Sequence, residues 1–338
     1  MSPSTAHAVD APAPGASAPA TGGRRHGRSP IAPAPATPWL FLAPFLALFG
    51  TFVLLPAGLG VWISLHDWDY TFVSHPFVGL RNYLDLLDPS STSGGPFWES
   101  MRATGVFTAS SVPLLLVVPL LVALMMNARF PGRNFLRAVY FAPYVLGVAV
   151  ISVLWRYLLD TNIGPVNHYL GLVGLPDATA WLTSQPAAWV SLVAVTVWWT
   201  LGFNAVIYLA ALQDIPAELY EAAQVDGASV AQRFWNVTLP GLRPVLMFVT
   251  VNTIIMSANM FGQSYLMTEG GPGRSTRTAI MRIADTGLSS FQMGSAAAMS
   301  YVLTLVLMLL SGVVFWLFRD RDAVRTRANV RTREKVRS

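Results

Sequence analysis

Residues 221–240 read EAAQVDGASVAQRFWNVTLP, a polar stretch with a glycine near its middle and a proline at its end. The rest of the 338-residue chain is unusually apolar: 53% of all residues are hydrophobic, 12% are charged and the mean hydropathy is +0.49. A soluble domain normally has about twice that share of charged residues. The composition therefore indicates an integral membrane protein, and the polar stretch is expected to lie outside the lipid.

A short helix is predicted at the start of this stretch, over residues 216–225. Pro216 suits a first helical turn, and Glu218 and Glu221 lie where carboxylates favour the positive end of the helix dipole. Gly227 is expected to end the helix, because glycine accepts the left-handed backbone conformation without steric cost.

A second helix is predicted after this turn. Ser229, followed three residues later by Gln232, resembles a capping box. Pro240 and Pro244 are expected to close the second helix and to begin the next apolar segment. The pattern predicts helix, sharp turn and helix, lying parallel to the membrane. On patterning alone, an ordinary surface loop and a docking site for another protein are equally supported.

Six segments are long and apolar enough to cross a membrane, since about 20 apolar residues span about 30 Å of hydrocarbon. They are residues 39–65, 103–126, 138–155, 187–212, 245–267 and 296–318. None of these segments contains Asp, Glu, Lys or Arg. The predicted fold class is therefore all-α, with six transmembrane helices.

The distribution of basic residues predicts the orientation of the chain. Of the 22 basic residues, 16 lie in the two tails and in the second and fourth loops. Cytoplasmic segments carry an excess of Lys and Arg, so both termini and the loop 213–241 are predicted to be cytoplasmic. The opposite face carries Arg274, Arg277 and Arg282, which make its last loop unusually basic.

Three parts of the chain differ in composition. Residues 1–38 are rich in Pro, Ala, Gly and Ser, which predicts a disordered cytoplasmic tail. Residues 39–318 contain the six predicted spans. Residues 319–338 form a basic cytoplasmic tail with eight basic residues, which would be attracted to anionic membrane lipid.

The residues of the polar stretch follow a specific spacing: E-A-A, D-G-A, a phenylalanine and L-P. They are Glu221, Ala222, Ala223, Asp226, Gly227, Ala228, Phe234, Leu239 and Pro240. This pattern resembles the signature loop of permease subunits in binding-protein-dependent ABC importers. GLRNYLDLL (79–87), LMTEGGPGRSTRT (266–278) and GSAAAMSYVL (294–303) are similar to segments of the sugar-importing branch, and the second resembles its maltose-type larger permease subunit. Ala103 departs from this pattern, since the family usually has Asn there.

The resemblance implies a permease subunit that translocates a mono-, di- or oligosaccharide across the cytoplasmic membrane. In that family the loop is a coupling helix that seats on a separate ATPase, which here implies docking by residues 217–225. The implied coupling residues are Glu221, Ala222, Ala223, Asp226, Gly227 and Ala228. The implied partners are a second related permease, two ATPase copies or domains and an extracytoplasmic solute-binding protein. A polyol or glycerol phosphate is the alternative solute.

An enzyme is disfavoured by the residues themselves. Lys335 is the only lysine and no glycine-rich frame precedes it, so a phosphate-binding loop cannot form and ATP must be hydrolysed by a partner chain. The five histidines are scattered and there is no cysteine, so neither a metal site nor a cofactor is expected. The arginines favour membrane topology over nucleic-acid binding.

A secondary transporter or a channel subunit is the remaining alternative. Ion coupling generally uses ionisable residues inside the membrane, and the predicted spans contain none. Nothing in the sequence resembles a selectivity filter or a ring of acidic residues.

Polar residues in the fourth and fifth predicted spans are candidates for lining a solute pathway. They are Asn204, Tyr208, Asn252, Ser257, Asn259 and Gln263. Sugar hydroxyls need amide and hydroxyl partners, and Trp198 and Trp199 could stack on sugar rings. The same polar side chains also suit hydrogen bonds between helices, and the two tryptophans also suit helix packing.

Overall fold

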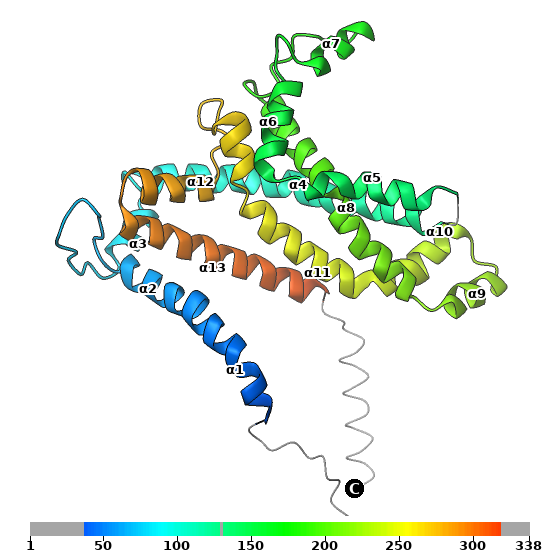
Figure 1. Ribbon diagram of the computed structural model, residues 1–338, viewed down its shortest axis with the longest axis horizontal. Helices are drawn as coiled ribbons and strands as arrows, with labels where there is room; N and C mark the ends of the chain where they lie inside the picture. Colours follow the sequence, from blue (N-terminus) through cyan, green and yellow to red (C-terminus); the bar gives the residue numbers. More distant parts are fainter. Residues whose placement is uncertain (1–36, 129–130, 319–338) are drawn as a thin grey trace, which may run out of the picture. The chain divides into compact units, whose positions relative to one another are not determined.

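The computed structural model describes residues 37–128 and 131–318, which are mainly helical (Figure 1). In chain order the elements are α1 (Thr37–Phe49), η1 (Gly50–Leu54), α2 (Leu55–Ser64), α3 (Arg81–Leu87), α4 (Gly94–Asn127), α5 (Arg133–Val145), α6 (Val148–Leu158), α7 (Pro165–Leu172), α8 (Ala187–Asp214), α9 (Ala217–Val225), α10 (Val230–Arg233), η2 (Phe234–Thr238), α11 (Leu239–Ala258), η3 (Ser264–Thr268), α12 (Ala279–Ala284), η4 (Asp285–Ser289) and α13 (Met293–Phe318), where η marks a π-helix. The all-α prediction is confirmed.

Most of the predicted N-terminal tail and the whole predicted C-terminal tail lie outside the described residues. Within the described part, residues 37–55 form one compact unit, and residues 56–318 belong to a second, much larger one. The smaller unit contains α1 and η1, and its residues from Trp39 onward begin the first candidate span.

Five helical segments of the described chain are long and apolar enough to cross a membrane. They are Trp39–Ser64, Gly94–Asn127, Ala187–Asp214, Val230–Ala258 and Met293–Phe318. A sixth crossing exists if the bent pair Arg133–Val145 and Val148–Leu158 counts as one span. Six predicted spans therefore correspond to five continuous helical spans and one broken one.

The predicted third span, residues 138–155, is wrong as a single helix. α5 and α6 meet at an angle of 98°, because Leu146 and Gly147 take extended backbone conformations. The break leaves the Leu146 carbonyl without a helical partner, and the indole Nε1 of Trp199 donates to it at 3.0 Å. A protein side chain thus satisfies a backbone group that lipid could not. Pro143 and Gly147, two residues that disfavour a continuous helix, were the available signal within this apolar run.

The predicted boundaries around the fifth span are also wrong. The helix begins at Val230, continues through Pro240 and Pro244 and ends at Ala258, whereas the prediction had a separate short helix followed by a span over 245–267. Pro240 lacks a backbone donor, and the π-helical turn η2 immediately precedes it. The second predicted helix is thus the first part of the span and not an independent helix parallel to the membrane.

The core of the larger unit lies between α4, α8 and α11. α4 packs along α8, α11 contacts both, and α5 covers α8. A Cβ at Gly202 would lie only 2.4 Å from the Tyr140 carbonyl oxygen, so α5 and α8 approach closely because this residue has no side chain. Figure 1 shows α9 at one end of the α8 and α11 pair and α12 at the other end.

Candidate functional site

The first helix of the signature loop lies where the sequence predicts it. α9 spans Ala217–Val225, and Gly227 has a φ of 76°. The Ala228 N–H donates to the Ala223 carbonyl at 2.9 Å, and the Gly227 N–H donates to the Gln224 carbonyl at 3.1 Å. These two bonds form a Schellman motif, which ends a helix with a left-handed residue. The predicted helix stop at Gly227 is confirmed.

The segment after the turn is anchored by two sets of hydrogen bonds. Ser229 and Gln232 form the predicted capping box, in which each side chain bonds the backbone N–H of the other residue. The hydroxyl of Tyr220 on α9 lies 3.0 Å from the hydroxyl of Thr238, which is buried in η2. α9 is therefore joined covalently to α8 and tied by a side chain to the start of the α11 span.

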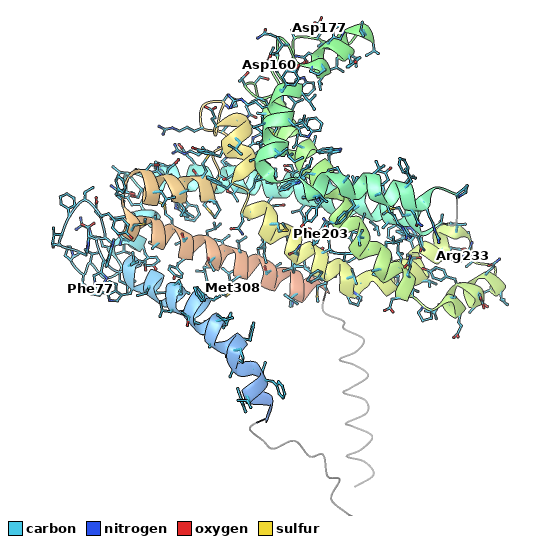
Figure 2. The ribbon with its side chains drawn as sticks, in the orientation of Figure 1. Phe77, Asp160, Asp177, Phe203, Arg233 and Met308 are labelled. Carbon is cyan, nitrogen blue, oxygen red and sulfur yellow. The ribbon has the colours of Figure 1, made fainter. Side chains whose placement is uncertain are left out.

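α9 buries none of its residues. Of the six predicted coupling residues, Glu221, Ala222, Asp226 and Gly227 are exposed and the two other alanines are partly buried. α9, α10 and η2 also carry large apolar side chains that the sequence prediction did not select, with these exposed fractions: Leu219 51%, Val225 88%, Val230 75% and Trp235 63%. These residues could have been found in the sequence, because each is a large apolar residue in an otherwise polar loop. We name these four residues the apolar coupling surface; Figure 2 shows Arg233 at the same end.

A cavity of about 240 Å³ lies between α5, α8 and α11. Its aromatic lining includes Tyr144, Trp199 and Phe203, and the rings of Tyr144 and Phe203 stack with centroids 4.9 Å apart. Its polar lining consists of Thr196, Thr200, Asn204, Thr253, Ser257, Asn259 and Gln263. Among the described residues that line this cavity, none is charged. Figure 2 shows Phe203 partway along α8.

The structure brings four of the six predicted pathway residues to this cavity: Asn204, Ser257, Asn259 and Gln263. Tyr208 is instead fully buried in the core between helices, and the Asn252 amide donates to the Met256 sulfur at 3.6 Å. Trp199 lines the cavity.

Trp198 does not line the cavity; it packs edge-on against Trp155 at 5.4 Å between ring centroids. The cavity also includes Tyr144, Thr200, Phe203 and Thr253, which the sequence analysis missed. Selecting Tyr144 required knowledge of the break after α5.

Two of the polar lining residues also connect helices. The Asn204 amide donates to the Leu115 carbonyl at 3.2 Å, and the Ser111 hydroxyl donates to the Ser257 hydroxyl at 3.3 Å. Both contacts join α4 to the helices that form the cavity wall. Asn204 and Ser257 therefore line the cavity and also hold helices together.

The opposite end of the α8 and α11 pair is fixed by buried threonines. Thr278 donates to the Met260 carbonyl at 2.7 Å and caps α12, while Thr276 donates to the Gly271 carbonyl at 2.6 Å. The Ala279 N–H donates to the Thr104 hydroxyl at 2.9 Å, which joins α12 to α4. Thr276 and Thr278 are fully buried.

A protein family described as "binding-protein-dependent transport system inner membrane component" matches residues 103–320. The trehalose/maltose transport system permease protein MalF of Thermococcus litoralis is 37% identical over 280 residues, covering 82% of this chain and 91% of that protein. The sn-glycerol-3-phosphate transport system permease protein UgpA of Yersinia pestis is 33% identical over 279 residues, covering 82% of this chain and 92% of that protein.

The chain is also similar in fold to a solved structure. A chain of a bacterial alginate ABC transporter, crystallised in complex with an alginate pentasaccharide-bound periplasmic protein, superimposes with a TM-score of 0.69. The two are 22% identical, and the match covers 83% of this chain and 93% of that chain.

Proposed function

The chain belongs to the binding-protein-dependent transport system inner membrane components, and from this premise we propose that it is the ABC importer permease through which a sugar crosses the cytoplasmic membrane. It is a multi-pass membrane subunit of a transport system and not an enzyme. ATP hydrolysis belongs to a partner, because the only lysine of the chain stands outside any phosphate-binding loop.

The uncharged cavity between α5, α8 and α11 is the observation that carries the choice of a sugar. A sugar presents hydroxyl groups around its ring and weakly polar C–H groups on its faces. The amides of Asn204, Asn259 and Gln263 suit the hydroxyl groups, and the rings of Tyr144 and Phe203 suit the C–H faces. The MalF relative is named for a trehalose/maltose transport system, which supports the same class of solute.

In the proposed assembly, different partners bind the cytoplasmic and the extracytoplasmic side of the permease. A cytoplasmic ATPase, present as two copies or domains, binds α9 and the apolar coupling surface. A second related permease completes the path for the solute, and an extracytoplasmic solute-binding protein delivers it. Both termini and the segment 213–241 are cytoplasmic in this arrangement, with residues 39–318 as the membrane domain.

The connections of α9 explain how ATP hydrolysis drives transport in this proposal. Closure of the ATPase subunits displaces α9, with Glu221, Asp226 and Gly227 at its contact. The displacement passes to α8 through the chain and to the α11 span through the contact of Tyr220 with Thr238. Since α8 and α11 line the cavity, its access alternates between the two faces of the membrane.

A glycerol phosphate is the second candidate solute. The UgpA relative, named for sn-glycerol-3-phosphate, is nearly as similar to this chain as the MalF relative, at 33% against 37% identity. The two candidates differ in charge, so a transport assay separates them.

The test compares two asparagines on α11 in the complete importer. The tagged chain is purified with its partners and placed in proteoliposomes, and ATP-driven uptake of labelled maltose, trehalose and sn-glycerol 3-phosphate is measured. Asn259→Leu removes an amide from the cavity, so KM should rise about tenfold, which corresponds to one lost hydrogen bond of about 1.4 kcal/mol. Asn252→Leu removes an amide outside the cavity and should leave KM within about twofold. Equal effects of the two variants, or uptake of glycerol phosphate alone, would contradict the proposed sugar site.

A further inference from the structure

A second pocket, of about 380 Å³, lies away from the uncharged cavity and shares no lining residue with it. The N-terminal half of α4, the start of α8 and the loop before α12 form its walls. We name it the arginine pocket and define it by Glu99, Arg102, Trp189, Arg274 and Ser275. Two guanidinium groups, one indole ring and one hydroxyl thus meet in one concavity.

The loop that carries Arg274 is held in place by its own hydrogen bonds. The Ser275 hydroxyl donates to the Pro272 carbonyl at 2.7 Å and accepts from the Gln185 amide at 2.7 Å. Arg274 itself has a φ of 71°, a left-handed conformation that L-residues other than glycine rarely adopt. The surrounding contacts therefore fix an arginine at a backbone position where a residue with a side chain is unfavourable.

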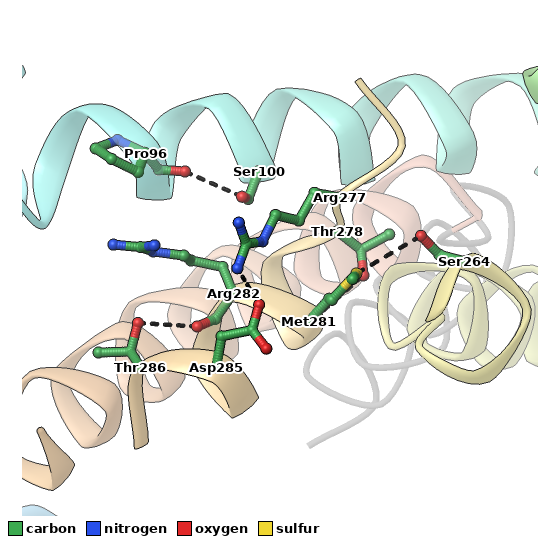
Figure 3. A network of polar contacts seen from close by, with 9 residues as sticks. All are labelled: Pro96, Ser100, Ser264, Arg277, Thr278, Met281, Arg282, Asp285 and Thr286. Carbon is green, nitrogen blue, oxygen red and sulfur yellow. Dashed lines mark hydrogen bonds and ion pairs between the residues drawn. The ribbon is translucent and has the colours of Figure 1, made fainter. Parts of the chain in front are cut away.

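The charges around this loop are unbalanced. Arg277 pairs with Asp285, and Figure 3 shows the Arg282 side chain pointing away from that carboxylate. Within residues 37–128 and 131–318, no ion pair joins Arg102, Arg274 or Arg282 to a carboxylate. Burial lowers the pKa of Arg282, the positive charges of Arg277 and Arg274 lower it further, and Asp285 only partly opposes them.

The Nε atom of Arg282 is another sign of this imbalance, because it is buried without a hydrogen-bond partner among the described residues. Glu99 lines the arginine pocket with Arg102 and Arg274, while Asp285 pairs with Arg277 and partly offsets the positive charge around Arg282. An anion bound at this end of the permease would offset the excess positive charge.

We propose that the arginine pocket binds the carboxylate or phosphate group of an acidic sugar, so that the solutes of this importer include anionic sugars. The inference rests on the proposed function and adds the charge of the solute to it. Arg102 and Arg274 hold the anionic group, since guanidinium groups bind carboxylate and phosphate oxygens with paired hydrogen bonds.

The remaining lining residues favour a sugar over an acidic protein side chain. The indole of Trp189 offers a face on which the C–H groups of a sugar ring pack. The Glu99 carboxylate and the Ser275 oxygen accept hydrogen bonds from ring hydroxyls. The pocket lies on α4 and α8, the helices that continue toward the uncharged cavity, so the sugar is bound here before its uncharged ring reaches that cavity.

The test uses the full chain in lipid nanodiscs and equilibrium dialysis with radiolabelled D-glucuronate, D-glucose and inorganic phosphate. Glucuronate and glucose differ only at C6, so their ratio isolates the contribution of the carboxylate. Glucuronate should bind at least about tenfold more tightly than glucose, and each of Arg102→Gln and Arg274→Asn should weaken its binding about tenfold. Asparagine tolerates the left-handed conformation of position 274, which preserves the loop. Arg81→Gln, at an exposed arginine outside the pocket, should leave binding unchanged.

Equal binding of glucuronate and glucose would overturn the proposal. So would inorganic phosphate that binds as tightly as glucuronate, because the sugar would then contribute nothing. Measuring ATP-driven uptake with the complete importer in proteoliposomes shows whether the acidic-sugar proposal fails alone or the proposed function fails with it. Uptake of neutral sugars without any uptake of glucuronate would leave the importer standing and overturn only the acidic solute. If these variants instead weakened binding of the solute-binding protein, with glucuronate binding unchanged, the pocket would be a protein contact and the proposal would be wrong.

Discussion

The two ends of the α8 and α11 pair are stabilised in different ways. At the end that carries α9, the apolar coupling surface is left uncovered, with Val225 88% and Trp235 63% exposed. At the end that carries α12, Thr276 and Thr278 are fully buried, and their hydroxyls bond carbonyl groups of the same chain. The α9 end therefore leaves apolar side chains uncovered, whereas the buried threonine hydroxyls of the α12 end are hydrogen-bonded within the described chain.

Because of this difference, the α12 end contributes mainly to the stability of the permease, and the α9 end contributes mainly to partner binding. Uncovered apolar side chains add little to the stability of the isolated permease, because burial has not yet removed them from water. Buried hydroxyls add to it directly, because an unpaired buried polar group is costly. Substitutions at the α12 end should lower stability, and substitutions at the α9 end should lower affinity for a partner.

The largest effect on stability is expected from Thr278→Val. This change removes both the bond to the Met260 carbonyl and the N-cap of α12, which together cost about 2 to 3 kcal/mol. The midpoint of heat denaturation in detergent should fall by about 5 °C or more. Thr183→Val, at an exposed threonine, is the matched control and should change the midpoint little. Equal midpoints for both variants would mean that the α12 end is not held by these bonds.

The largest effect on partner binding is expected from Trp235→Ala. Truncation of a tryptophan at the centre of an interface commonly costs about 2 kcal/mol, so the Kd for the purified ATPase should rise about thirtyfold. Trp316→Ala is the matched control, because Trp316 is also 63% exposed but lies on α13. Heat denaturation of the free permease should be unchanged in both variants. A lower midpoint for Trp235→Ala with an unchanged Kd would assign this residue to folding.

The contrast between the ends also separates what the sequence could predict from what it could not. Local chemistry predicted the stop at Gly227 and the capping box of Ser229 with Gln232, because both depend on neighbouring residues only. The break at Leu146 was missed although Pro143 and Gly147 lie beside it, and its partner, the Trp199 indole, is distant in sequence. Asn259 and Gln263, which were selected for their polarity within an apolar run, line the cavity, whereas Tyr144, which also lines it, was missed.

Gly227→Val should have a smaller effect, confined to the α9 end. Nothing lies within 4 Å of a Cβ built on Gly227, so a clash cannot cause it. The left-handed conformation alone costs a β-branched residue about 1 to 2 kcal/mol. The Schellman motif should loosen, and ATPase activity stimulated by solute should fall several-fold in the reconstituted importer. Gly227→Asn should retain most of that activity, because asparagine adopts this conformation more readily. Full activity of the valine variant would show that coupling does not depend on the turn.

The smallest effect is expected from Arg156→Gln, on the same end as α12. Arg156 pairs with Glu269 at 3.0 Å, but their side chains are 56% and 69% exposed. Exposed pairs contribute at most about 0.5 to 1 kcal/mol, since water and salt screen the attraction. The denaturation midpoint should therefore fall by no more than about 2 °C, and less at high salt.

Arg277→Gln provides the contrast to that variant, because the Arg277–Asp285 pair is only 23% and 28% exposed. Loss of the more buried pair leaves the Asp285 carboxylate partly desolvated without its partner, so the decrease should be larger and should persist in salt. A decrease for Arg156→Gln as large as that for Thr278→Val would mean that exposed ion pairs, and not buried hydroxyls, hold the α12 end. The difference between the two ends would then be one of charge and not of burial.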